Sequence, residues 1–171
     1  MPEKKEKPKI EDIIKNNLNG DEQKNALSFV EYLRDKKLNP QWSAANAWKV
    51  TYKSFTVCFI RLHGCADYHN LDKGTWHILP FIGDYEKNVL SDNDKDIVWE
   101  NKKKCKVCGQ CALKLSKIFG REFVNACEGS ILFINPDCKA IECAKKLVIL
   151  RVDDIRNGNA KKHKYIAVKD R

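Results

Sequence analysis

The feature that most limits the possible folds of this chain is a change in the spacing of its apolar residues around Pro40. Before this proline, apolar residues recur every three or four positions, which predicts an amphipathic helix over residues 21–38. The helix must end there, because a proline disfavours the helical conformation of the residue before it. From Trp48 to Phe59, aromatic and β-branched residues instead alternate with polar ones, which predicts strands.

The other predicted elements continue this order of helices, strands and a last helix. Residues 48–59 form either two strands that turn at Lys53-Ser54 or one long bent strand. The last helix runs over 135–157, with Asn135 as its N-cap and Pro136 in its first turn. We further predict helices at 10–18 and 94–101 and strands at 75–82 and 130–134. This order favours an α+β fold: an antiparallel sheet with the N- and C-terminal helices packed on one face, plus a cysteine-rich metal-binding insertion.

The length of 171 residues fits one domain that buries a core without help from disulfides or metal. Residues 1–9 alternate lysine and glutamate between two prolines, and we expect them to be disordered. The domain then covers residues 10–158, with a metal knuckle at 102–127, and residues 159–171 form a polar C-terminal tail.

Several observations indicate a cytoplasmic protein with reduced thiols. The longest apolar runs are far shorter than the roughly 20 residues that a membrane-spanning helix needs, and the charged N-terminus resembles no secretory signal. Cytosolic reductants would keep the eight cysteines from forming a disulfide framework. These cysteines are therefore expected to be metal ligands, redox groups or plain thiols.

The strongest chemical signal is the row Cys105, Cys108 and Cys111, in which Gly109 follows a Cys-x-x-Cys pair. Such a pair with a following glycine is typical of a knuckle that turns both sulfur atoms inward. Zinc needs four ligands in a tetrahedron, and a closed set of cysteines is its usual structural site. We predict Cys127 as the fourth ligand, with Cys138 as the alternative.

Other chemistry of the same cysteines stays open. Lysines 102, 103, 104 and 106 favour the thiolate form, which binds metal and also attacks electrophiles. An iron–sulfur cluster, iron handling or thiol redox chemistry are therefore the alternatives to zinc. By contrast, Cys143 on the apolar face of the last helix and Cys58 in a strand are predicted to be buried core residues.

Two further groups of residues are candidate sites. A second metal site could form in the segment 63–69, but an ordinary polar loop is the favoured interpretation, and His77 is predicted to be a sheet residue and not a catalytic base. The residues of this candidate metal site are His63, Cys65, Asp67 and His69.

The tryptophans line either a ligand pocket or the core. They are Trp42, Trp48, Trp76 and Trp99.

The functional hypothesis that follows is a zinc-containing binding or adaptor module with an unknown protein or small-molecule partner. The sequence contains no phosphate-binding loop, no nucleophile elbow and no metal-binding histidine helix, so nothing argues for an enzyme. The formal charge of +9 makes nucleic acid a possible partner. The acidic stretch 84–100 between the basic segments weakens that possibility.

The helix at 22–38, the aromatic stretch 48–59 and the strand 76–79 together resemble the YdhG-like family of small bacterial proteins, over about residues 23–155. The stretch 118–127 is similar to a cysteine-containing clostridial branch. This resemblance implies a compact α+β fold of mostly unknown function, with one branch linked to iron delivery in the manner of frataxin. The present chain departs from that picture, because it is basic where frataxin-type iron handling uses an acidic ridge, and it adds the cysteine cluster.

Overall fold

The helical spacing near the N-terminus produces two helices joined by a short turn. A computed structural model describes residues 7–65, 72–82, 86–87, 89–103, 115–124 and 131–160. In it, α1 (Ile10–Asn17) and α2 (Gly20–Asp35) bury one apolar stripe each. The predicted amphipathic helix is confirmed in α2, where the buried stripe consists of Ala26, Phe29, Val30 and Leu33, whereas Leu27 is only partly buried.

The alternating segment forms a hairpin, which decides between the two predicted arrangements. The strands β2 (Ala47–Tyr52) and β3 (Phe55–Leu62) pair in antiparallel register, and the turn residues Lys53 and Ser54 both have positive φ angles, 46° and 68°. Such a turn matches the right-handed twist of two antiparallel strands. The sheet is antiparallel throughout and has the order β1-β2-β3-β4-β7. Its strands are β1 (Gln41–Ala44), β2 (Ala47–Tyr52), β3 (Phe55–Leu62), β4 (Trp76–Pro80) and β7 (Phe133–Ile134).

The remaining helices are α3 (Asp92–Glu100) and α4 (Cys138–Arg156). The prediction of Asn135 as the N-cap of α4 is wrong. Asp137 is the cap, because its carboxylate accepts a 2.8 Å hydrogen bond from the backbone N–H of Ala140. The side chain of Asn135 is already engaged elsewhere, since its Oδ1 accepts from the backbone N–H of Trp76 at 3.0 Å.

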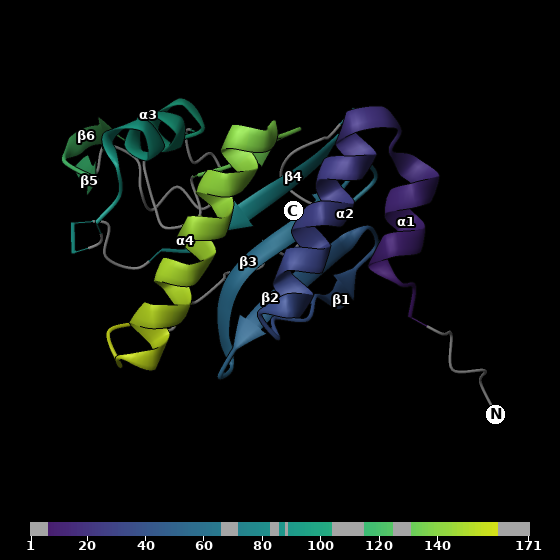
Figure 1. The fold of residues 1–171 in the computed structure, drawn as a ribbon, viewed down its shortest axis with the longest axis horizontal. Coiled ribbons are helices and arrows are strands. Elements are labelled where there is room, and N and C mark those ends of the chain that lie inside the picture. The colour runs from purple at the N-terminus through teal and green to yellow at the C-terminus, as the bar shows by residue number, and fades with distance from the viewer. Residues whose placement is uncertain are drawn as a thin grey trace, which may run out of the picture.

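The main core lies between one face of the sheet and helices α1, α2 and α4, which lie in front of the strands in Figure 1. The antiparallel register places Val50, Cys58 and Ile78 on this face. The described residues thus contain four helices and a five-stranded antiparallel sheet, and the predicted α+β class is confirmed. No helix among them combines the length and the apolar character that crossing a membrane requires.

The other face of the sheet carries a second, smaller apolar cluster of Phe59, Leu79, Phe81 and Leu132. Beside it, Arg61 and His77 face each other across β3 and β4, and both are buried. His77 is therefore a buried sheet residue, which agrees with the sequence-based interpretation.

Candidate metal centre

The four predicted ligands lie in two segments, 104–114 and 125–130, that fall outside the described residues. Cys105, Cys108 and Cys111 belong to the first segment, and Cys127 belongs to the second. The described residues on either side define where both segments begin and end. We call these flanking residues, 101–103, 115–124 and 131–132, the cysteine frame.

Two backbone pairings close the cysteine frame. Lys102 and Ile131 form an isolated antiparallel bridge, and the adjacent N–H of Leu132 donates to the carbonyl oxygen of Asn101 at 2.9 Å. Between the two segments, β5 (Leu115–Ile118) and β6 (Arg121–Val124) form a hairpin in which Leu115 pairs with Val124. Each pairing places one end of the first segment beside one end of the second.

A lysine side chain joins these two pairings. Lys102 Nζ donates a 3.1 Å hydrogen bond to the carbonyl oxygen of Val124 and lies 4.9 Å from the ring centroid of Phe123. The bridge and the open end of the hairpin are therefore no farther apart than one lysine side chain can reach. The chain from Lys102 to Leu115 could span about 45 Å if extended. Lys102 and Leu115 are instead both in contact with Val124.

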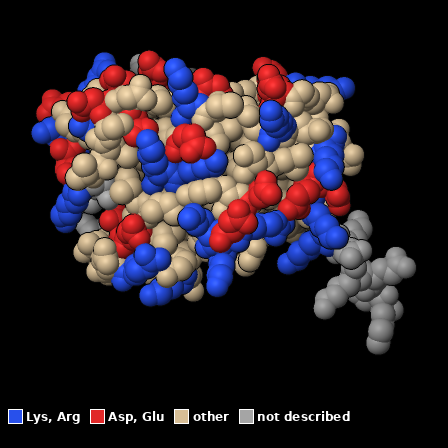
Figure 2. Space-filling model, in the orientation of Figure 1, with Lys and Arg blue, Asp and Glu red and all other residues tan. Residues whose placement is uncertain are grey.

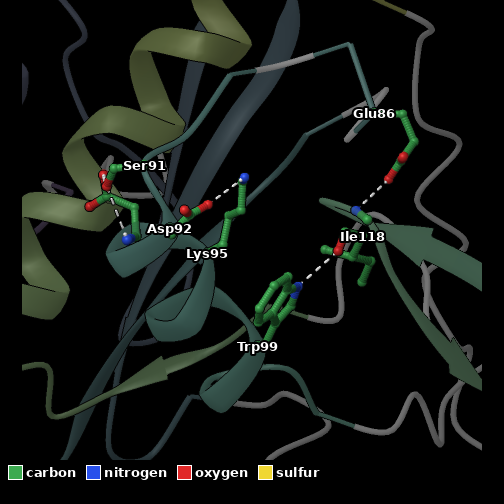
Figure 3. A network of polar contacts seen from close by, with 8 residues as sticks. Glu86, Ser91, Asp92, Lys95, Trp99 and Ile118 are labelled. Carbon is green, nitrogen blue, oxygen red and sulfur yellow. Dashed lines mark hydrogen bonds and ion pairs between the residues drawn. The ribbon is translucent and has the colours of Figure 1, made fainter.

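The closed end of the hairpin is held in the protein core. Ile118 and Phe119 are buried, and the indole Nε1 of Trp99 in α3 donates to the Ile118 carbonyl at 2.8 Å. The backbone N–H of Gly120 donates to Glu86 Oε1 at 2.9 Å (Figure 3). The Trp99 bond attaches the hairpin to α3, and the Glu86 bond attaches it to the turn at residues 86–87 that precedes α3 (Figure 3).

The turn residues explain why this hairpin forms where it does. Phe119 and Gly120 both have positive φ angles, 48° and 87°, as a two-residue hairpin turn requires. Phe119 of the turn is buried, whereas Leu115 and Val124 at the open end are 63% and 47% exposed. The two hairpin residues that adjoin the cysteine segments are therefore at the surface. This hairpin is not among the elements predicted from the sequence, although Phe119-Gly120 between two short apolar runs is a signal for it.

Cys138, the alternative fourth ligand, is directed to another part of the molecule. Its Sγ lies 3.9 Å from Oδ1 of Asn25 in α2. In Figure 1, α2 and α3 flank α4 on opposite sides, and the β5–β6 hairpin lies beside α3. The Cys138 thiol is thus turned toward the side of α4 away from α3.

Cys58 and Cys143 are fully buried thiols, as predicted. Burial raises the pKa of Cys58. Burial, with a smaller contribution from the charge of Asp94, raises the pKa of Cys143 to about 12. Both side chains stay protonated at neutral pH, so neither supplies a thiolate for metal or redox chemistry.

The proposed second metal group is only partly described. His63 and Cys65 lie in the turn after β3, where their backbone N–H groups donate to the carbonyls of Thr75 and Leu62. Asp67 and His69 lie outside the described residues. In the part of the chain that is described, no three His, Cys, Asp or Glu side chains are grouped so that they could hold a metal ion.

The tryptophans do not gather around one pocket. Trp48 and Trp76 are buried in the main core, Trp42 is 38% exposed on the edge strand β1, and Trp99 packs against the hairpin. One groove of about 480 Å³ lies between α2, α3 and α4, and another of about 530 Å³ lies between α3 and the start of α4. Neither groove is lined by a tryptophan.

Charges of both signs are interspersed on the face that carries the helices (Figure 2). An example is the ion pair between Lys146 of α4 and Asp94 of α3, with a shortest distance of 2.7 Å. This face therefore does not form a uniformly basic surface for a polyanion, despite the net charge of +9.

Comparison of the chain with models of known protein families, with curated proteins and with solved structures found no match. The resemblance to the YdhG-like family therefore stays a prediction.

Proposed function

We propose that this chain is a metal-binding module in which Cys105, Cys108, Cys111 and Cys127 hold one zinc ion. The observation that supports the proposal is the closed cysteine frame. Cys111 lies four residues before Leu115 and Cys127 three residues after Val124, and those two strand residues are paired. Because both cysteines start from neighbouring strand ends, they are within reach of a common ion. Four sulfur atoms at ~2.3 Å complete the tetrahedron that zinc prefers.

A closed set of four thiolates leaves no open position for water or substrate, which favours a structural role. The ion would bind the two segments to each other, and the hairpin would transmit this restraint to α3 through Trp99 and to the turn before α3 through Glu86. The module would then act as a binding or adaptor unit in the cytoplasm. Cys127 is preferred over Cys138, because the Cys138 thiol is directed toward Asn25.

The test is metal analysis of anaerobically purified protein by mass spectrometry. We expect about one equivalent of zinc in the natural chain and in a Cys138→Ser variant, and loss of zinc in Cys108→Ser and Cys127→Ser. The Cys138→Ser variant is the matched control, since it removes an exposed thiol that lies outside the cysteine frame.

The same experiment separates the alternatives. Less than half an equivalent of all metals in the natural chain would contradict the proposal. If the protein is brown, absorbs visible light and contains iron in place of zinc, the cysteines hold an iron–sulfur centre and not a structural zinc ion. Loss of zinc in Cys138→Ser but not in Cys127→Ser would identify Cys138, and not Cys127, as the fourth ligand.

A further inference from the structure

The strand β1 forms one edge of the five-stranded sheet, and among the described strands it pairs only with β2. All four of its residues, Gln41 to Ala44, are exposed. On the outer side of an edge strand, backbone N–H and C=O groups are directed away from the sheet without a strand partner. β1 therefore presents a row of donors and acceptors to which another strand can pair.

The usual protection of such an edge is missing from β1. Charged side chains, above all those of lysine, keep the edge strands of natural proteins from pairing with other strands. β1 has none, and it lies within residues 38–48, the longest stretch without a charged residue in a chain of which 32% of the residues are charged. It also exposes the large apolar side chain of Trp42. The edge thus has both the backbone groups and the apolar side chain that strand pairing uses.

The position of Trp42 indicates which pairing suits this edge. Trp42 lies directly opposite Trp48 of β2, and Trp48 belongs to the main core, so the Trp42 side chain lies on the helix-bearing face of the sheet. A two-fold axis perpendicular to the sheet keeps this face on the same side in two copies. With the axis at Trp42, the two indole rings become a directly opposite cross-strand pair, and aromatic pairs of this kind stabilise antiparallel strands.

Symmetry and charge favour a second copy of this chain as the partner. A two-fold contact brings the same surface of both copies together, so a charge on the strand would meet a like charge. β1 avoids this repulsion because it is uncharged. The opposite edge of the sheet offers no comparable strand, because β7 has only two residues. Pairing of β1 with β1 is therefore favoured over head-to-tail pairing of β1 with β7, and it closes at two copies.

We propose that the chain forms a symmetric dimer in which β1 of each copy pairs antiparallel with β1 of the other around Trp42. The two five-stranded sheets then become one continuous sheet. In Figure 1, β1 and the β5–β6 hairpin lie at opposite sides of the molecule, so the two cysteine frames lie far from the dimer contact. The contact is independent of the metal site, and the dimer presents two such sites, one toward each end.

The first test measures the mass of the full chain by analytical ultracentrifugation at several concentrations. Four residues from each copy make a small interface, so we expect a dissociation constant on the order of 10–100 μM. The mass should therefore rise from 19.7 kDa toward twice that value as the concentration increases. The mass of a single chain at all concentrations up to about 1 mM would overturn the inference.

Hydrogen exchange locates the contact without any substitution. The outward-facing amides of β1 should exchange more slowly at high than at low protein concentration, because the partner strand accepts their hydrogen bonds. The amides of β7, at the opposite edge, should exchange at the same rate in both samples. Slower exchange at another surface at high concentration, with no change in β1, would contradict the proposal.

Two variants at the axis test the pairing itself. Trp42→Lys and Trp42→Glu each place like charges opposite each other, so each should weaken the dimer about ten-fold or more. An equimolar mixture of the two variants should recover the dimer, because opposite charges then face each other. A mixture that stays monomeric, although circular dichroism shows both variants to be folded, would overturn the inference.

The matched control is Ile134→Lys on the other edge strand, β7. The side chain of Ile134 is 42% exposed, close to the 38% of Trp42. This variant adds the same charge to an edge of the sheet and should dimerise as the natural chain does. Equal weakening by Trp42→Lys and Ile134→Lys would show a general effect of the added charge and overturn the assignment to β1.

Discussion

The indole of Trp99 donates a 2.8 Å hydrogen bond to the carbonyl oxygen of Ile118, and this bond attaches the β5–β6 hairpin to α3 (Figure 3). The two residues come from different elements, and the segment with three of the proposed zinc ligands lies between them in sequence. The stability of the cysteine frame should therefore depend on Trp99.

Trp99→Phe keeps an aromatic ring against the hairpin and removes the donor. The carbonyl of Ile118 then loses its partner, which should cost about 1 kcal/mol of stability. We expect zinc affinity to fall several-fold, measured by competition with a chromogenic chelator. Trp42→Phe on the edge strand is the control. An equal loss of zinc affinity in both variants would contradict the role of the Trp99 hydrogen bond in the cysteine frame.

Gly120→Ala tests the hairpin turn by backbone strain alone. Gly120 has a φ angle of 87°, and an added Cβ would meet no other atom within 4 Å. The substitution should cost about 1 kcal/mol, because a side chain disfavours this conformation. Gly158→Ala at the end of α4 imposes comparable strain at a φ of 74°. Both variants should melt at lower temperature in thermal unfolding, but only Gly120→Ala should bind zinc more weakly.

Asp94 should contribute to stability at neutral pH and not in acid. Burial alone would raise the pKa of its carboxyl, but hydrogen bonds from Lys146 and Ser91 outweigh burial and hold the pKa below its ordinary value. Because the unfolded pKa is about 4, the contribution is complete above that pH. It is lost as the pH falls through the lower pKa of the folded state.

Asp94→Asn should therefore lower the free energy of unfolding by about 1–3 kcal/mol at pH 7. The difference from the natural chain should shrink below about pH 4, as denaturant unfolding at several pH values would show. Asp92→Asn is the control, since Asp92 is exposed and pairs with Lys95 at 2.8 Å. A constant difference between Asp94→Asn and the natural chain down to pH 2 would refute this role of the carboxylate.

Thiol labelling should divide seven of the eight cysteines, all but Cys65, into three groups. Cys138 is exposed and should react with iodoacetamide in the native protein. Cys58 and Cys143 are buried and protonated, so they should react only after unfolding. The four proposed ligands should become reactive when a chelator removes zinc, and peptide mass spectrometry would assign each site. Full labelling of Cys105 and Cys108 before chelation would count against the metal site.

Local patterns were sufficient to predict the elements whose stability is local. The helices α1 and α2 and the turn at Lys53-Ser54 follow from apolar spacing and turn chemistry within a few residues. β1 was missed because all four of its residues are exposed, so it has no buried alternating pattern. It forms by pairing with β2.

The cap of α4 shows the limit of such local reasoning. Asn135 and Asp137 are both good capping residues by their chemistry, and the sequence offers no means to choose between them. The choice depends on the backbone of Trp76, a residue far away in sequence, which donates to Asn135 and leaves Asp137 as the cap.

The sequence by itself determined the class of the fold, the buried thiols and the row of cysteines that indicates a metal, because residue type and spacing act over short distances. Only the tertiary structure decided that Lys102 meets Ile131, that the hairpin is attached to α3 and that the Cys138 thiol is directed toward α2. Those contacts join residues far apart in the chain. They depend on how the helices and the sheet share one core, which no local pattern records.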